Sequence, residues 1–162
     1  MPTTSSAPAW RRFAALVYDA LAVVAIVMVV GLVAQMATGG QLVDREGHQL
    51  TWWYQPLQGV VVGAYFLLSW VRGGQTLGMR PWRIRVTDAN GAPAGWARAL
   101  LRLAVAALPL LLLLLYPMVS MKAALYAPLA GWAVLLLPAP FDPRRRAVYD
   151  MVAGTEIRRL PT

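Results

Sequence analysis

The feature that most constrains this chain is a long apolar run over residues 13–37, in which Asp19 is the only charged residue. Because about 20 apolar residues are enough to cross a bilayer, the run predicts a membrane-spanning helix. At about 1.5 Å per residue, Asp19 lies about 9 Å beyond Phe13 along this helix. A carboxylate at that depth is costly without a partner, water or a proton, so it marks a functional or structural polar site. Arg12, nearly two turns earlier, projects from the same helix face.

Composition supports a membrane protein. Hydrophobic residues make up 59% of the 162 residues and charged residues make up 14%, against about 45–50% and about 25% in soluble domains. The chain has no cysteine, which excludes disulfides, zinc–thiolate sites and thiol catalysis. A net charge of +8 would suggest a nucleic-acid partner in a soluble chain. Here the basic residues follow a membrane topology, so we expect no nucleic-acid partner.

Three further apolar segments follow the first. We predict helices over residues 13–37, 53–71, 99–117 and 122–139, and hence an all-α membrane protein with a bundle of four transmembrane helices. Trp53 and Trp70 stand near the two ends of the second segment, as aromatic residues do at the rims of a bilayer. Pro109 should kink the third helix near its middle.

The connections differ in character. Residues 38–51 form a polar loop whose His48 is the only histidine, so we expect no metal site and no cofactor. Residues 82–87 alternate apolar with basic or polar side chains. This pattern predicts a short amphipathic strand or interfacial segment, with Trp82, Ile84 and Val86 facing lipid or protein; the alternative is a solvated basic loop. We expect a disordered tail over 1–9, one transmembrane domain over 10–157 and a tail over 158–162.

Four spans would place both termini and the 72–98 segment on one side of the membrane. Arg45 and Lys122 then lie opposite, and the remaining thirteen of the 15 basic residues lie on or near that one side: Arg11, Arg12, Arg72, Arg80, Arg83, Arg85, Arg98, Arg102, Arg144, Arg145, Arg146, Arg158 and Arg159. By the positive-inside rule this side is cytoplasmic. Anionic lipid headgroups at this side are therefore expected partners.

The same topology predicts a polar cluster in the cytoplasmic leaflet. Asp19 and Arg102 lie at comparable depth and should reach one another. Asp150 should return to the same interface near Arg11, Arg12 or Arg98. Opposite charges would reduce the cost of burying each group. The candidate cluster, either an ion or proton site or a helix clamp, comprises Arg12, Asp19, Arg98, Arg102 and Asp150.

Five segments together repeat the pattern of a known family. An arginine opens the first helix, an aspartate follows partway along it, and a Gly-Gln-Thr-x-Gly stretch follows the second helix; an arginine enters the third, and an aspartate precedes Ala-Gly-Thr. The segments are 12–19, 74–80, 84–88, 98–102 and 146–155. In this pattern the chain resembles the RDD family of small bacterial membrane proteins, named for an arginine and two aspartates.

The resemblance maps the family's arginine to Arg12 and its aspartates to Asp19 and Asp150. The loop motif comprises Gly74, Gln75, Thr76, Gly78 and Arg80. Met79 stands where the family commonly has lysine, and Arg80 and Arg83 could replace its charge. The resemblance implies an inner-membrane, multi-pass protein suspected of taking part in transport, and it supplies no substrate.

Two functions stay open. In the first, a structural or accessory role, the charges clamp the helices and the 72–98 segment presents a surface to a membrane or cytoplasmic protein or to anionic lipid. In the second, Asp19 with Asp150 and Arg102 exchanges a proton for a small cation. Four short helices leave little room for a pore, so a transporter would be a homo-oligomer. Enzyme motifs such as Ser/His/Asp, HExxH or a phosphate loop are missing, so we expect no enzyme.

Overall fold

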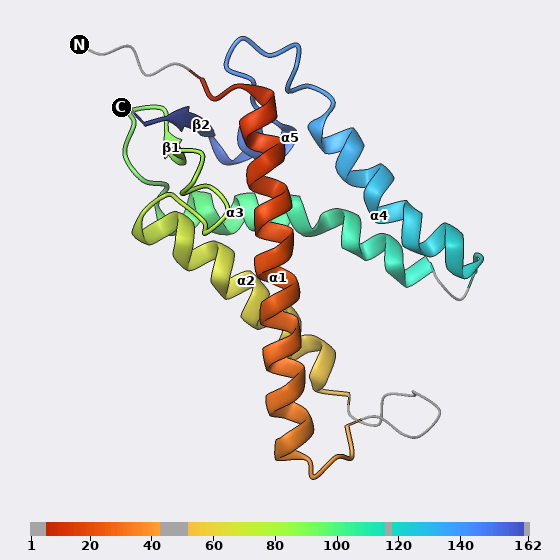
Figure 1. Cartoon of the computed structure of the whole chain (residues 1–162). Helices are drawn as coiled ribbons and strands as arrows, with labels where there is room; N and C mark the ends of the chain where they lie inside the picture. The colour runs from red at the N-terminus through yellow and green to blue at the C-terminus, as the bar shows by residue number, and fades with distance from the viewer. Residues whose placement is uncertain (1–5, 43–51, 116–117, 161–162) are drawn as a thin grey trace.

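The computed structural model describes residues 6–42, 52–115 and 118–160. Its elements, shown in Figure 1, are the helices α1 (Ala9–Ala37), α2 (Tyr54–Arg72), α3 (Trp96–Ala107), the 3₁₀ helix η1 (Leu108–Leu115), α4 (Met121–Leu136) and α5 (Val148–Ala153), and the strands β1 (Ile84–Asp88) and β2 (Thr155–Arg159). The predicted helices are therefore present with shifted ends, whereas α5 and β2 were not predicted. Residues 43–51 of the predicted polar loop, including His48, lie outside the described residues.

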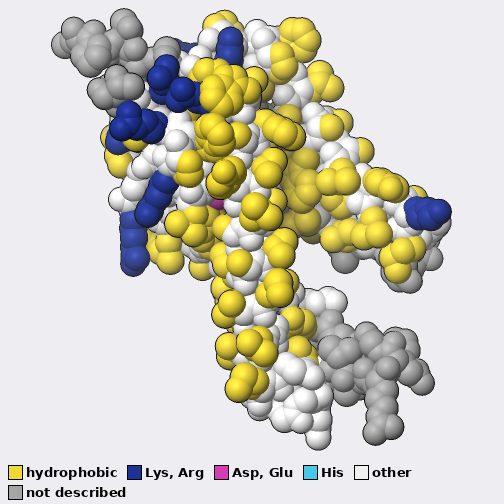
Figure 2. Space-filling model, viewed as in Figure 1, with side chains coloured by type: hydrophobic (Ala, Val, Ile, Leu, Met, Phe, Trp, Pro, Cys, Tyr) yellow, Lys and Arg dark blue, Asp and Glu magenta, His cyan; other side chains and the backbone are white. Residues whose placement is uncertain are grey.

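Among the described residues, two segments are long and apolar enough to cross a membrane, namely Ala9–Ala37 and Trp96–Leu113. Helix α4 is apolar but shorter. Only 6% of the apolar window of α1 is buried, so α1 is not the covered core helix of a soluble domain. Apolar side chains cover the visible length of α1 and of α4 in Figure 2. Outward-facing apolar side chains of this kind match a lipid environment.

The helices form two hairpins that diverge. Helix α1 packs on α2, η1 packs on α4, and the contact between α2 and α3 joins the two pairs. In Figure 1, α1 runs from top to bottom, whereas α3 and η1 run across it. The helices are therefore not all aligned, and the bundle of four transmembrane helices stays a prediction.

The third predicted helix changes its type at Pro109 instead of simply kinking. The α-helix ends at Ala107 and continues as η1, where Pro109 has no N–H to donate. A Cβ added at Gly131 of α4 would lie 2.9 Å from Pro109 Cβ, so the two segments approach closely. Trp132 Nε1 donates to the carbonyl of Ala106 at 2.8 Å and fastens the same contact.

The remaining residues form a cap over one end of α1, α2 and α3. It consists of residues 73–95, which include β1, residues 138–160, which include α5 and β2, and Ser6–Ala7. Strand β1 pairs antiparallel with β2. Val86 N donates to Gly74 O at 2.7 Å on one edge, and Ala7 N donates to Ile157 O at 3.1 Å on the other. Both edges of the small sheet are therefore covered, which protects them from pairing with another chain.

The cap decides three expectations. The strand predicted over 82–87 is present as β1, with Ile84 and Val86 fully buried in protein, which is one of the two surroundings expected for them, and the alternative of a solvated loop is wrong. Arg158 and Arg159 belong to β2, not to a tail. Ala7 is fully buried, so the end of the predicted disordered tail is part of the fold.

The buried apolar side chains gather where the cap meets the helices. This core comprises Ala7, Ala15, Trp70, Met79, Ile84, Val86, Ala94, Ala99 and Ile157. Met79, which replaces the lysine common in the resembled family, is 7% exposed within it. Burial of apolar area therefore stabilises the junction between cap and helices.

Candidate functional site

Asp19 lies in α1 at this junction and is 4% exposed. Its Oδ1 accepts hydrogen bonds from Tyr65 Oη and Gly78 N, both at 2.9 Å. Its Oδ2 accepts one from Thr76 Oγ1 at 2.6 Å. Both carboxylate oxygens are thus occupied by donors from α2 and the following loop, and no cationic side chain pairs with Asp19 in the described part of the chain.

The loop reaches Asp19 because Gly78 has no side chain. A Cβ at Gly78 would lie 2.4 Å from Ala15 O and 2.7 Å from Asp19 Cγ. Thr76 Oγ1, while donating to Asp19, accepts a hydrogen bond from Met79 N at 3.3 Å and so closes the turn. Irregular backbone is tolerated near membrane depth only where protein satisfies it, as it does here.

The first half of the loop motif holds β1. Gly74 has φ +70°, and a Cβ there would lie 2.5 Å from Val86 O, so glycine is required on both grounds. Gln75 Nε2 donates to Ile84 O at 2.9 Å. Arg80, the last residue of the motif, is exposed. The motif therefore joins the cap sheet to α1 through its first four members.

Tyr65 is a member of the site that sequence reasoning missed. Its hydroxyl donates to Asp19 and accepts a hydrogen bond from Leu77 N at 3.0 Å. The available signal was a hydroxyl within the second apolar segment, because a buried tyrosine hydroxyl needs a partner.

Arg102 and Asp150 form a second, separate contact. They are 3% and 0% exposed, and Arg102 Nη1 donates to Asp150 Oδ1. Thr155 Oγ1 also accepts from Arg102 Nη1 at 3.1 Å, and Asp150 Oδ2 accepts from Ala147 N at 3.2 Å. A buried ion pair needs hydrogen bonds for its remaining atoms. These bonds satisfy both Asp150 oxygens and Arg102 Nη1, whereas Arg102 Nε is buried without a partner among the described residues.

Two aromatic rings enclose the Arg102 guanidinium. Its Cζ lies 4.8 Å from the centre of the Trp70 ring and 4.9 Å from that of Tyr149. Each ring face attracts the cation and shields it from water. Tyr149 is in α5 and Trp70 is in α2, so the Arg102 side chain of α3 contacts both of these helices.

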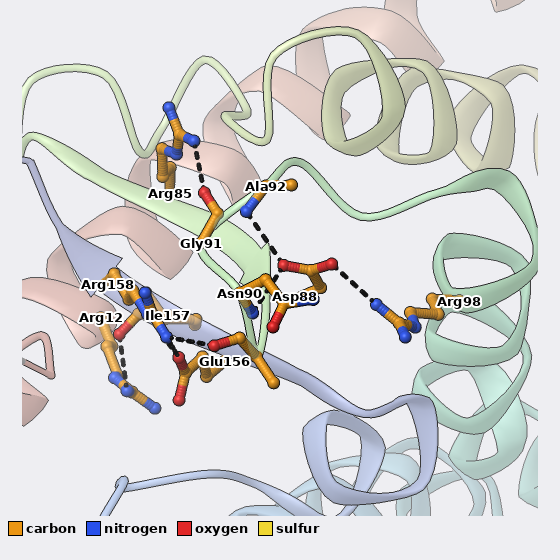
Figure 3. A network of polar contacts seen from close by, with 11 residues as sticks. Arg12, Arg85, Asp88, Asn90, Gly91, Ala92, Arg98, Glu156, Ile157 and Arg158 are labelled. Atoms are coloured by element: carbon orange, nitrogen blue, oxygen red, sulfur yellow. Dashed lines mark hydrogen bonds and ion pairs between the residues drawn. The ribbon is translucent and has the colours of Figure 1, made fainter.

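Arg12 and Arg98 serve other contacts of the cap. The Arg12 guanidinium donates to the carbonyls of Ala7 and Ile157, each at 3.2 Å, and to that of Arg145. Arg98 Nη1 lies 3.0 Å from Asp88 Oδ2. Figure 3 shows the Arg12 and Arg98 contacts on opposite sides of the two strands. In the part of the chain that the structure describes, Arg12 thus donates to backbone oxygens and to no carboxylate.

Asp88 shows the electrostatics of this network. Burial acts to raise the pKa of Asp88, but hydrogen bonds from the N–H groups of Ala92 and Asn90, followed by Arg98, outweigh it and lower that pKa. The two backbone bonds, each of 2.9 Å, close the turn after β1. Asp88 therefore stays ionised and holds the start of α3 beside the sheet.

The expected single cluster is divided into separate contacts. The predicted pairing of Asp19 with Arg102 is wrong, because α1 packs on α2 and its carboxylate meets the loop after α2. The predicted return of Asp150 to Arg11, Arg12 or Arg98 is also wrong, because α5 packs on α3 and Asp150 meets Arg102. Each contact nevertheless joins a membrane-facing helix to the cap.

Other charged groups lie at the surface of the cap. Asp142 accepts hydrogen bonds from Arg146 Nε and Nη2, both at 3.0 Å, and these bonds lower its pKa to about 2. A pocket of about 350 Å³ includes neither Asp19 nor Asp150 and is lined by Ser6, Ala89, Pro143, Arg144, Glu156, Ile157 and Arg158. Within the described ranges, no group of three or more His, Cys, Asp or Glu residues could hold a metal ion.

Comparison with known proteins gives one finding. The family model described as the RDD family matches residues 6–154, which include every contact described above except those made by β2. The match confirms the resemblance inferred from the five segments. Searches of curated proteins and of solved structures gave no match.

Proposed function

The chain belongs to the RDD family, and from this membership we propose that it is a structural or accessory protein of a bacterial inner membrane. In this role, buried polar contacts hold the cap rigidly on the membrane helices. The cap then presents a fixed cytoplasmic surface to a membrane or cytoplasmic protein partner. The proposal assigns no enzymatic activity and no nucleic-acid binding.

One observation carries this proposal: the oxygens of both mapped aspartates accept hydrogen bonds from the protein itself. Asp19 is held by three donors, and Asp150 by Arg102, Thr155 and Ala147 N. A carboxylate whose oxygens are all occupied is suited to fixing structure, because a ligand would have to displace existing bonds.

We further propose four spans with both termini in the cytoplasm. Helix α2 returns along α1, and α4 returns along η1, so that each hairpin would cross and come back. Ser6 forms a bridge with Arg158, which supports one location for both ends of the chain. Residues 73–95 and 138–160 of the cap carry eight of the 15 basic residues, which favours the cytoplasmic side for the cap.

The absence of cysteine allows a clean test of this topology. Single cysteines at Asn90 in the cap, at Gly39 after α1 and at Met118 between η1 and α4 would be labelled with a membrane-impermeant maleimide. We expect Gly39→Cys and Met118→Cys to react in spheroplasts, and Asn90→Cys to react only after permeabilisation. Reaction of Asn90→Cys and Met118→Cys from the same side would contradict the four-span arrangement.

Transport is the alternative function. It is favoured by the lack of a cationic partner for Asp19 among the described residues, because such a carboxylate could exchange a proton for a small cation. A transporter of this size would work as a homo-oligomer.

Ion-driven pH changes in proteoliposomes separate the two functions. Wild type, Asp19→Asn and the control Asp142→Asn would be compared at equal folded incorporation with Na⁺, K⁺ and Li⁺. We expect no flux in any of them, and a larger loss of thermal stability for the buried Asp19→Asn than for Asp142→Asn, whose carboxylate bonds Arg146 at the surface. Flux that Asp19→Asn abolishes, while its stability and the activity of Asp142→Asn are unchanged, would establish transport instead.

A further inference from the structure

A cluster of aromatic and basic side chains lies beside the N-terminal turns of α1. The Trp82 ring packs edge-on against Trp10, with centres 5.4 Å apart, and against Tyr18, with centres 5.9 Å apart. Arg11 Nη1 donates to Trp82 O at 3.1 Å, and its Cζ lies 5.1 Å from the Trp10 ring centre. We call Trp10, Arg11, Arg80, Trp82 and Arg83 the arginine–tryptophan cluster.

The positive charge of this cluster is uncompensated. Among the residues described, Arg11, Arg80 and Arg83 form no ion pair, whereas Arg98 and Arg146 pair with carboxylates. Arg80 and Arg83 are exposed and flank a turn closed by Arg83 N donating to Arg80 O at 3.1 Å. Figure 2 shows basic side chains gathered beside apolar ones near this end of α1. Three neighbouring cations without counter-charges favour an anionic ligand.

Two N–H groups within the cluster lack acceptors. Arg11 Nε and Trp82 Nε1 are buried and have no hydrogen-bond partner. Leaving such donors unsatisfied costs free energy. Because both atoms lie below the surface, a ligand would first meet the exposed side chains of Arg80 and Arg83. Arg83 also adopts φ +51°, a conformation costly for any residue other than glycine. The cluster therefore combines two unsatisfied donors, one in α1 and one in the turn, with a strained backbone at Arg83.

We propose that the arginine–tryptophan cluster binds the phosphate of an anionic phospholipid in the cytoplasmic leaflet. The assignment rests on the topology proposed above. Trp10 is 57% exposed and the neighbouring Phe13 is 70% exposed, so the cations adjoin an apolar surface at the start of a spanning helix. Tryptophan and arginine side chains occupy this headgroup level, and guanidinium groups bind phosphate through paired hydrogen bonds.

Native mass spectrometry of the full chain in detergent tests the site. Phosphatidylglycerol would be titrated against wild type, Arg80→Gln/Arg83→Gln and Arg144→Gln/Arg145→Gln. The two double variants remove equal charge from exposed side chains, and each includes one arginine with a left-handed backbone, Arg83 or Arg145. We expect about tenfold weaker binding for the first variant only, because each basic residue near an anionic lipid contributes to affinity. Equal weakening in both would overturn the site.

Control ligands and one further variant identify which ligand binds and which side chains of the protein donate to it. Zwitterionic phosphatidylcholine should bind every variant alike and more weakly than phosphatidylglycerol binds wild type. Inorganic phosphate, titrated by calorimetry into lipid-free protein, should not saturate the cluster; saturation that the Arg80→Gln/Arg83→Gln variant abolishes would overturn lipid as the source. Arg11→Gln, with thermal unfolding as a folding check, should weaken phosphatidylglycerol binding as well. None of these measurements depends on topology or flux, so this site can fail independently of the proposed function.

Discussion

Thr76 Oγ1 donates a hydrogen bond of 2.6 Å to Asp19 Oδ2 across 57 residues of sequence. The bond joins the loop after α2 to α1, at the point where Gly78 lets the two backbones approach. Arg102 makes the equivalent connection from α3 to α5 through Asp150. The mapped aspartates thus act as two separate fasteners between helices and cap. Their energetic weight can be measured one at a time.

Replacement of Asp19 tests the first fastener. Asp19→Ala leaves the donors of Tyr65, Thr76 and Gly78 unsatisfied, and we expect the free energy of unfolding to fall by about 3 kcal/mol or more. Asp19→Asn keeps one acceptor oxygen and should lose less. Denaturant unfolding in detergent, followed by circular dichroism, measures both. Wild-type stability of Asp19→Ala would rule out a structural role for this contact.

Gly78→Ala tests the close approach of the loop to α1. The added Cβ would meet backbone at 2.4 Å, so we expect a loss of about 2 kcal/mol or more in unfolding free energy. Gly59→Ala in α2 is the matched control, because its Cβ meets nothing within 4 Å and alanine favours a helix by about 1 kcal/mol. Thermal melts of the two variants should therefore shift in opposite directions; a shared shift would contradict the packing described.

Arg102 and Asp150 form the second fastener, which a double-mutant cycle can test. Arg102→Gln leaves a buried carboxylate unpaired and should cost about 3–5 kcal/mol in unfolding free energy. Asp150→Asn should cost a similar amount. The combined variant should lose clearly less than the sum of the two, because neither charge is then left alone. Additive losses would mean that the two side chains are not coupled.

Asp142 offers a prediction in pH. Hydrogen bonding from Arg146 lowers its pKa from 3.8 to about 2 in the folded protein. Because the folded pKa is below the unfolded one, the ionised form stabilises the fold above about pH 4. This stabilisation is lost as pH falls toward 2. Carbon-detected NMR of labelled aspartate in detergent should show the low midpoint.

Arg146→Gln is the control for that titration. Removing the guanidinium should move the Asp142 midpoint back toward the ordinary aspartate range, because its side-chain bonds are the largest cause of the shift. Arg85→Gln, which removes equal charge from a side chain bonded to Gly91 O, should leave the midpoint unchanged. Equal shifts in the two variants would attribute the low pKa to overall charge.

The sequence by itself determined the apolar segments, the strand over 82–87 and the polar residues that need an explanation. These features are local. Composition identifies an apolar helix, alternation identifies a strand, and a charged residue within an apolar segment can be recognised without knowing the fold. The family pattern was equally legible, because it consists of residue types at fixed positions. The short elements α5 and β2 carry too little local signal and depend on tertiary packing.

Only the tertiary structure decided which groups meet. Asp19 contacts Tyr65, Thr76 and Gly78, and Asp150 contacts Arg102, because α1 packs on α2 while α3 packs on α5. Apolar helix faces toward lipid and toward protein look alike in sequence, so hydrophobicity cannot set the packing order. The packing partners of the helices instead follow from the few polar atoms that need hydrogen bonds where water is excluded, and the partners of these atoms are distant in the chain.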